Sequence, residues 1–376
     1  MTTPVEPDAL IASLRERIGQ HPDPETGRPI QSTGQLGEIT LDGDTVKMSV
    51  GITSHCQPIA DEIADTIRDL ALTVAPGKTI EVQTPVHARP PARLGQVGLK
   101  AKSVILVGSG KGGVGKSTVA ASLALTLRRL GANVGLMDAD VYGPSVPHLL
   151  GLSGRPAISE DKKIEPIRLG PNGESGVPPE TEGAMPVMSM GFLLEPDQAV
   201  IWRGPMLHGS IQQFLRDTSW GELDYLVIDM PPGTGDIALT LSQAIPITGA
   251  VVVCTPQEVA LLDAVKAISM FRKVNIPIAG MVENMSGFTC PDCGKTYDIF
   301  GRGGARDKAE ELTVPYLGGL PIDITLREAG DAGKLAEVLA NDHRARAPFD
   351  QVARSLVRNL AAKAASAPPK ASLPTL

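Results

Sequence analysis

Apolar residues recur with two different periods in the first part of the chain and predict a small mixed domain. Residues 9–18 place four large aliphatic side chains on one face of a short amphipathic helix. Residues 38–53 alternate apolar and polar positions around an Asp-Gly-Asp turn, which predicts a β-hairpin. Helical spacing returns over 58–74, and residues 79–83 read as one more strand. We therefore expect an α+β domain with the order αββαβ over residues 1–84.

A second pattern covers residues 102–364, where short apolar runs rich in β-branched residues alternate with segments of helical period. This alternation is typical of a parallel sheet covered by helices. We expect an α/β fold with a mostly parallel sheet and helices on both faces. After a first strand that begins near Ser103, the predicted strands cover 133–137, 225–229, 250–255, 278–282 and 316–320.

Segments without clear periodicity separate or end these regions. Residues 85–101 contain several prolines and predict a linker between two domains. Residues 154–186 are rich in Pro, Gly and Glu, which predicts an irregular insert with a short hairpin near 163–169. A last helix is predicted over 348–364, and the Pro/Ser/Ala-rich residues 365–376 are expected to be disordered.

A glycine-rich loop follows the first strand of the second region and precedes a helix. Gly110, Gly115, Lys116 and Ser117 fit the pattern G-x-x-x-x-G-K-S/T of a phosphate-binding loop. Its amide groups and the helix N-terminus can face phosphate oxygens, the lysine can reach the β- and γ-phosphates, and the hydroxyl can bind Mg²⁺. The residues expected to bind ATP here are Gly110, Lys111, Gly112, Gly113, Val114, Gly115, Lys116, Ser117 and Thr118.

Three carboxylates stand at the carboxyl ends of predicted strands, where open α/β sheets bind their ligands. Asp138 and Asp229 end strands and are expected on the Mg²⁺ side of the site, together with Ser117. Asp140 is expected to orient the water that attacks the γ-phosphate, with Lys111 and Lys116 as the other catalytic residues. The alternative for Asp140 is a cap on the turn that follows it.

The net charge and the lack of long apolar stretches restrict the kinds of binding partner that we expect. The chain has 376 residues and a formal net charge of −7, so its overall field does not favour nucleic acid or anionic lipid. No secretory signal pattern is present, and no stretch approaches the roughly 18 apolar residues of a membrane span. We expect a cytoplasmic protein that binds neither nucleic acid nor membrane. Its four cysteines are then available for packing, metal binding or redox chemistry.

Two of these cysteines form a C-x-x-C motif, Cys290 and Cys293, shortly after a predicted strand. Two thiolates at this spacing can bind one metal ion or one edge of an iron–sulfur cluster. A tetrahedral zinc ion or a [4Fe–4S] cluster takes four ligands, and the other two cysteines are poorly placed. Cys254 lies within an apolar strand, and Cys56 belongs to the other domain. A symmetric homodimer would supply the missing pair across its axis.

The phosphate loop carries a second lysine, Lys111, in the sequence K-G-G-x-G-K-S. Here the chain resembles the deviant-Walker-A class of P-loop ATPases, which includes the Min and Par proteins. The resemblance implies a face-to-face dimer in which Lys111 reaches the nucleotide of the partner subunit. The alternative is a solvated surface lysine.

Several further motifs make the region from Gly108 to Gly319 similar to the Mrp/ApbC family of iron–sulfur cluster carrier ATPases. The resemblance implies an ATP hydrolase that holds a [4Fe–4S] cluster on Cys290 and Cys293 at a dimer interface. It also implies transfer of the cluster from a donor to acceptor apoproteins, and an adenine contact from Asn284. The motifs are Gly110 to Ser117, Asp138 to Ser145, Trp202 to Met206, Asp229 to Asp236, Pro256 to Leu261, Glu283 to Gly294 and Phe300 to Gly304.

The first domain resembles the MIP18-like domain that precedes the ATPase in many bacterial members. Thr53 to Pro58 lies where that domain carries Thr-x-x-Cys-Pro, although Gln57 separates Cys56 from the proline here. A reactive thiol and a structural cysteine are both open for Cys56. Two other functions stay open for the whole chain: a spatial organiser of the Min/Par type, and an ATPase with a structural zinc at its C-x-x-C motif.

Overall fold

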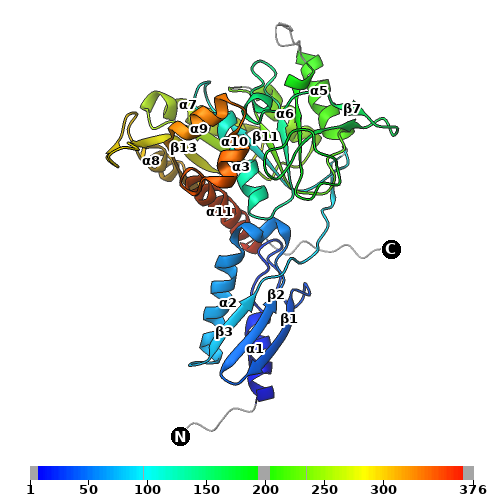
Figure 1. The fold of residues 1–376 in the computed structure, drawn as a ribbon, viewed down its shortest axis with the longest axis vertical. Coiled ribbons are helices and arrows are strands. Elements are labelled where there is room, and N and C mark those ends of the chain that lie inside the picture. Colours follow the sequence, from blue (N-terminus) through cyan, green and yellow to red (C-terminus); the bar gives the residue numbers. More distant parts are fainter. Residues whose placement is uncertain (1–6, 96, 194–203, 234, 367–376) are drawn as a thin grey trace. The chain divides into compact units, whose positions relative to one another are not determined.

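The computed structural model describes residues 7–95, 97–193, 204–233 and 235–366. Its internal contacts divide the chain into two units (Figure 1). The first contains the residues up to Arg89 together with those from Val357 onward, and the second runs from Pro90 to Leu356.

The first unit has the predicted αββαβ order around a three-stranded sheet. Strands β1 and β2 are antiparallel and β3 is parallel to β2, so β2 lies in the middle. The apolar positions of β2 are buried, as its alternation predicts. The second helix begins as a 3₁₀ turn because Pro58 lacks the N–H that an α-helix interior requires. The elements are α1 (Pro7–Gly19), β1 (Leu36–Asp42), β2 (Thr45–Val50), η1 (Ser54–Ile59), α2 (Ala60–Val74) and β3 (Thr79–Gln83).

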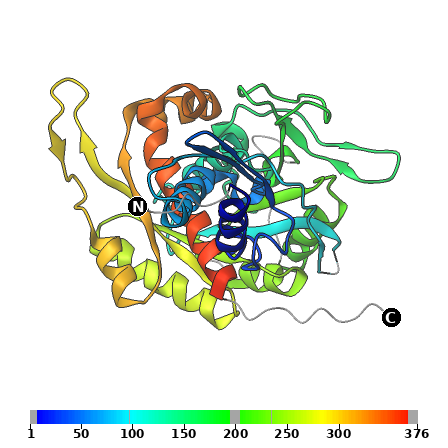
Figure 2. The ribbon, with the colours of Figure 1, turned by 90° about the horizontal axis from the view of Figure 1, so that it is seen from below.

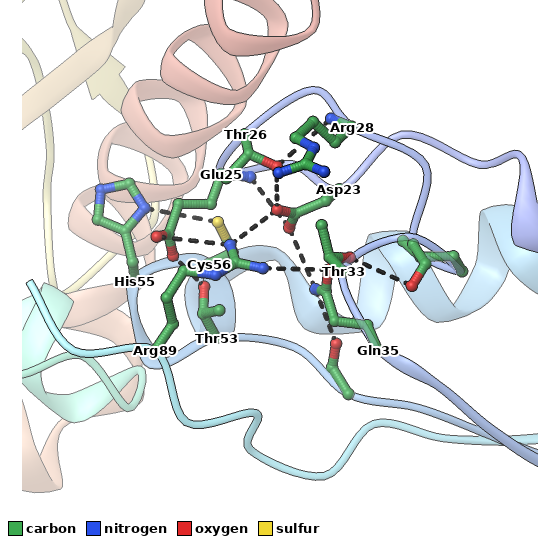
Figure 3. A network of polar contacts seen from close by, with 12 residues as sticks. Asp23, Glu25, Thr26, Arg28, Thr33, Gln35, Thr53, His55, Cys56 and Arg89 are labelled. Carbon is green, nitrogen blue, oxygen red and sulfur yellow. Dashed lines mark hydrogen bonds and ion pairs between the residues drawn. The ribbon is translucent and has the colours of Figure 1, made fainter. Parts of the chain in front are cut away.

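A buried polar network fastens the long connection between α1 and β1 (Figure 3). Asp23 is fully buried and accepts hydrogen bonds from Thr26 Oγ1 at 2.6 Å and from Arg89 Nη1 at 2.7 Å. Arg89 also lies 3.5 Å from Glu25, which accepts a bond from Thr53 Oγ1 at 2.6 Å. Burial raises the pKa of Asp23, but the bonds from Thr26 and Arg89 outweigh it and leave the pKa below its ordinary value.

The second unit is built on a ten-stranded sheet whose main path runs β14-β13-β12-β5-β11-β6-β10-β9. Strands β5, β6, β10, β11, β12, β13 and β15 pair in parallel, while β4, β9 and β14 join antiparallel to them. The expectation of a mostly parallel sheet flanked by helices is thus confirmed. The strands are β4 (Arg93–Leu94), β5 (Leu99–Gly108), β6 (Val134–Asp138), β9 (Ile167–Leu169), β10 (Met185–Ser189), β11 (Leu223–Asp229), β12 (Gly249–Cys254), β13 (Ile278–Thr289), β14 (Thr296–Tyr297) and β15 (Tyr316–Ile322).

Helices and a short hairpin complete this unit, and the last helix, α11 (His343–Ser366), continues past Leu356 into residues of the first unit. Every residue of β6, β11 and β12 is buried, as expected for parallel strands covered on both faces. A separate hairpin of β7 (Ala157–Ile158) and β8 (Ile164–Glu165) projects from the insert. The helices are α3 (Lys116–Arg129), α4 (Val146–Leu149), η2 (Met190–Phe192), α5 (Gly204–Asp217), α6 (Gly235–Ala244), α7 (Glu258–Lys273), α8 (Gly304–Glu311), α9 (Ile324–Asp331), α10 (Leu335–Asn341) and α11 (His343–Ser366).

Several helices and strands begin or end at other residues than predicted. The predicted linker over 85–101 includes the start of β5, because Leu99 and Ala101 are buried and their strand pairs with β4. Strand β10 lies at the end of the predicted irregular insert, and its methionines pack into the core. Helix α11 begins at His343, five residues before the predicted start at Pro348, so this proline lies inside the helix. The helix ends at Ser366, within the predicted tail.

Among the described residues, no helix combines the length and the low charge that crossing a bilayer would require.

Replacing Asp23 by Asn should destabilise the first unit by about 2 kcal/mol at neutral pH, because charge-assisted hydrogen bonds are lost in a buried place. The pKa of folded Asp23 is lowered, so its contribution is complete above the ordinary value of about 3.9 and is lost as the pH falls through the folded value. Hydrogen exchange of peptides from residues 20–35, followed against urea at several pH values, measures this difference.

The exposed Asp42, which pairs with Lys47 at the surface, supplies the control substitution Asp42→Asn. If Asp23→Asn and Asp42→Asn changed exchange equally, the buried network would not stabilise this connection.

Candidate functional site

The phosphate loop (residues 109–117) joins the end of β5 to the start of α3 with the backbone conformation that its glycines allow. Gly113 and Gly115 both have φ of 79°, in the left-handed region that other residues rarely adopt. A Cβ on Gly110 would collide with the backbone carbonyl of Asp263 on α7, so only glycine fits there. The hydroxyl of Ser109 donates to the carbonyl of Lys111 at 2.9 Å and closes the turn.

Lys116 is the only positive charge found at the centre of the site among the described residues, and its side chain is 7% exposed. Its ammonium donates to Asp229 Oδ1 at 2.6 Å and to Ser117 Oγ at 3.0 Å. The ammonium also lies 3.7 Å from Asp140 Oδ2. The structure therefore brings together four of the residues that the sequence assigns to phosphate and metal chemistry.

The register of two parallel strands places two of the predicted carboxylates side by side. Asp138 ends β6, Asp229 ends β11, and the two are direct partners across the ladder. Both are fully buried. Burial, followed by the charge of Asp229, raises the pKa of Asp138 to about 7. Burial also raises the pKa of Asp229, although the ammonium of Lys116 opposes that shift.

The oxygens of this group suit a magnesium ion. Asp229 Oδ2 is buried and has no hydrogen-bond partner among the described residues, while Oδ1 is bound to Lys116. A free carboxylate oxygen near the hydroxyl of Ser117 is the kind of oxygen donor set that Mg²⁺ prefers. Asp138 differs from Asp229, because its oxygens already accept bonds from the N–H groups of Asp140 and Val146 and from the hydroxyl of Ser189. Asp138 therefore suits a contact through water better than a direct one.

Asp140 caps the turn that follows it, which is the alternative that the sequence left open. Its Oδ1 accepts the N–H groups of Tyr142 and Gly143 at 3.3 Å each, which caps the following turn. Its other oxygen faces the ammonium of Lys116. The turn bonds hold the carboxylate at the edge of the phosphate site.

Asn284, on β13, contacts the phosphate loop from two strands away in the sheet. Its side-chain amide donates to the carbonyl of Val114 at 2.8 Å. A cavity of about 330 Å³ opens beside it, lined also by Thr118, Phe300 and Asp323. The volume is within the range of small-molecule sites. Lys111 is half-buried in the loop, and no ion pair of its side chain is found within the described ranges.

Cys290 and Cys293 lie on a hairpin that extends from β13 and returns through β14 (Figure 2, yellow). We call residues 287–302 the cysteine hairpin. Cys290 is half-exposed and Cys293 exposed. The N–H groups of Cys293 and Asp292, together with the thiol of Cys293, lower the pKa of Cys290. This shift favours the thiolate, which is the form that binds metal.

The other two cysteines are buried. Cys254 is buried in β12, and burial followed by the charge of Glu283 raises the pKa of its thiol to about 12. Cys56 is buried in the first unit, with its sulfur 3.5 Å from Nδ1 of His55 (Figure 3). Across the part of the chain that is described, no three His, Cys, Asp or Glu side chains gather as a metal site.

Some functional features were absent from the sequence prediction. Ser189 binds Asp138, but no strand was predicted over its residues, because β10 begins only at the end of the predicted insert over 154–186. Glu283 was seen only as part of a motif, although it is fully buried and accepts three hydrogen bonds. A polar residue at the carboxyl end of an apolar strand was the available signal. Trp202 and Arg203 of another motif lie outside the described residues.

Comparison with known proteins gives two family matches. Residues 100–357 match the family described as NUBPL iron-transfer P-loop NTPase, and residues 12–83 match the family described as iron-sulfur cluster assembly protein.

Individual relatives agree with these matches. The chain is 45% identical over 370 residues to the iron-sulfur cluster carrier protein of Deinococcus radiodurans, which covers 98% of this chain and 99% of that one. It is 48% identical to the mouse iron-sulfur cluster transfer protein NUBPL, over 62% of this chain and 70% of that one. Among solved structures, a nucleotide-binding protein from Archaeoglobus fulgidus in complex with ADP is 41% identical, with a TM-score of 0.53, over 63% of this chain and 88% of that one.

Removing the ammonium of Lys116 should destabilise the nucleotide-free protein as well as weaken phosphate binding. The substitution Lys116→Ala leaves Asp229 buried without its counter-charge, which costs about 3–5 kcal/mol. The double variant Lys116→Ala/Asp229→Asn should recover more than half of that loss, because the buried charge is removed too. Urea unfolding of the second unit, followed by tryptophan fluorescence, measures both values. Equal stability of the single and double variants would contradict the pairing.

Proposed function

The chain belongs to the family of NUBPL iron-transfer P-loop NTPases, and we propose that it binds iron–sulfur clusters and transfers them to acceptor apoproteins in an ATP-dependent manner. One observation carries this proposal. The strand β13 that places Asn284 against the phosphate loop continues directly into the hairpin that bears Cys290 and Cys293. The names of the relatives, cluster carrier and cluster transfer protein, support the same function.

The cargo is a [4Fe–4S] cluster shared by two copies of the chain. Cys290 and Cys293 offer two thiols on an exposed hairpin, and such a cluster takes four thiolates. The described residues contain no third ligand nearby, so a second subunit related by a two-fold axis completes the set. In the same dimer Lys111 reaches the nucleotide bound to the partner subunit, as its half-buried place in the loop permits.

Hydrolysis of ATP depends on positioning and on charge neutralisation. The loop amides and Lys116 hold the β- and γ-phosphates, and Asp140 orients the attacking water from its capped turn. Mg²⁺, when bound, would neutralise phosphate charge from a site made by Ser117 and Asp229, with Asp138 acting through water. Phosphate oxygens then replace Asp229 as partners of the ammonium, so nucleotide binding changes the contacts of the buried pair.

The base of the nucleotide occupies the cavity beside Asn284. Its volume of about 330 Å³ and its mixed lining suit an adenine ring with one amide to recognise its edge. The ADP named in the related Archaeoglobus fulgidus structure supports this assignment.

The two-domain organisation is part of the proposal. Residues 1–84 serve as the MIP18-like domain and residues 102–364 as the ATPase and carrier domain, joined by a linker within 85–101. The family match over residues 12–83 supports the first of these. The cluster donor and the acceptor apoproteins are the partners of the whole chain.

Anaerobic reconstitution with iron and sulfide should load the wild-type protein with four irons per two chains, because Cys₄ ligation of [4Fe–4S] needs two C-x-x-C pairs. Cys290→Ala and Cys293→Ala should each reduce bound iron to about a tenth or less, since a cluster with two of its four thiolates removed is weakly held. The variant Cys254→Ala, at a buried cysteine whose thiol pKa is about 12, is the matched control and should load normally.

Metal analysis of the same samples distinguishes the alternatives. A colourless dimer that contains one zinc ion would show that the cysteines form a structural zinc site and do not bind a cluster. Normal loading of the Cys290→Ala variant would show that these cysteines are not the ligands.

Cluster release to an apoprotein should depend on nucleotide. Lys116→Ala, which lacks the phosphate-binding ammonium, and Lys111→Ala, which lacks the charge supplied to the partner subunit, should both lower ATP hydrolysis by at least about 10²-fold. Both should also slow ATP-stimulated release, measured by the activity that an apo-acceptor gains with time. Lys266→Ala, on the exposed face of α7, is the control. If release were as fast with Lys116→Ala as with wild type, cluster transfer would not depend on nucleotide.

A further inference from the structure

Glu283 is a buried carboxylate that holds both ends of the cysteine hairpin. It lies on β13 with no exposed surface. Its Oε1 accepts the hydroxyl of Ser286 at 2.5 Å and the N–H of Gly303 at 2.8 Å, and its Oε2 accepts the N–H of Ala305 at 2.8 Å. Ser286 precedes the hairpin, and the two N–H groups follow it at the start of α8. One side chain therefore joins the two ends of the segment that carries Cys290.

The next residue on the strand contacts the nucleotide loop. Asn284 donates to the carbonyl of Val114 at 2.8 Å, and successive residues of a strand point to opposite faces. Two neighbouring positions of β13 thus hold the phosphate loop on one face and the base of the hairpin on the other. Because Glu283 and Asn284 are adjacent in the chain, a displacement of the strand at Asn284 also moves Glu283.

This part of β13 departs from a regular ladder. Met285 has φ of 60°, in the left-handed region that is unfavourable for a residue with a side chain. The register with β15 also shifts between Asn284 and Phe288. A strained and irregular stretch that lies directly between these two contacts and the cysteine hairpin is the kind of place where a strand can adopt a second arrangement.

The hairpin base has room for such a change. A cavity of about 630 Å³ borders it, lined by Glu283 and by residues at both ends of the hairpin, including Gly287, Thr289 and Arg302. The carboxylate of Glu283 has no ion pair with a lysine or arginine in the described ranges, so its hold on the hairpin depends on the three hydrogen bonds. A simple helix cap on α8 would explain the bonds from Gly303 and Ala305, but it would not explain the bond to Ser286.

We propose that Glu283 is a positioning residue that couples nucleotide binding at the phosphate loop to the placement of Cys290 and Cys293. The idea that this coupling controls how exposed the cluster is rests on the proposed function. The coupling itself is a property of the cluster-free protein. Nucleotide alters the loop at Val114, Asn284 carries that change to β13, and Glu283 transmits it to both ends of the hairpin.

The test measures how fast iodoacetamide alkylates Cys290 and Cys293 in cluster-free protein, resolved by peptide mass spectrometry. In the wild type, Mg-ADP or a non-hydrolysable ATP analogue should change this rate by about fivefold or more, the usual lower range of coupling between sites. In Glu283→Gln, which keeps the shape and removes the charge, the ratio of the rates with and without nucleotide should fall to about 1. The dissociation constant for Mg-ADP should stay within about twofold of wild type, a smaller change than coupled sites show.

Glu310→Gln, at an exposed glutamate on α8, is the matched control and should keep the wild-type ratio. Ser286→Ala removes one of the three bonds and should give an intermediate ratio, which keeps the test valid if Glu283→Gln does not fold. A wild-type ratio in Glu283→Gln, or no effect of nucleotide in the wild type, would overturn the proposal. A loss of Mg-ADP binding in Glu283→Gln would also overturn it, because the residue would then serve the nucleotide site itself. None of these outcomes depends on cluster transfer.

Discussion

The ion pair between Lys116 and Asp229 is the interaction on which the site depends. Two parallel strands in register bury the carboxylates of Asp138 and Asp229 side by side, and the ammonium of Lys116 binds Asp229. Burial raises the pKa of both carboxylates, so the group is short of positive charge. Such a site is suited to a metal ion, which adds charge and binds the carboxylate oxygen that has no partner.

The surrounding backbone is arranged to keep that pair in place. Gly110 allows the phosphate loop to lie against α7, and left-handed glycines turn the loop toward the start of α3. The amide of Asn284 then fastens the loop to β13 through the carbonyl of Val114. A change of partner at Lys116 would therefore act on the phosphate loop and, through Asn284, on β13.

The cysteine hairpin has the opposite character. It is exposed, it extends from the sheet, and its two thiols are an incomplete ligand set. Its attachment to the unit runs through β13 and the buried carboxylate of Glu283. The buried phosphate-loop site and the exposed cysteine hairpin thus share one strand, an arrangement that suits the proposed carrier, which has to hold its cargo and also release it.

Much of this protein follows from local sequence. The strand-loop-helix around Lys116, the acidic ends of two apolar strands and the C-x-x-C motif were all predicted, because backbone conformation and ligand chemistry depend on residue type at short spacing. The boundary errors at Leu99 and in strand β10 arose where tertiary packing overrides a weak local pattern.

Only the tertiary structure decided how these pieces meet. Strand register set Asp138 beside Asp229, and a left-handed turn at Met285 directly follows Glu283 and Asn284, the residues that contact the hairpin base and the phosphate loop. Neither is visible in hydrophobic periodicity, because register depends on pairing between segments far apart in the chain, and a left-handed methionine persists only where its surroundings hold it. The sequence by itself thus determined which chemistry the protein carries, and the fold decided which residues connect the nucleotide to the cysteines.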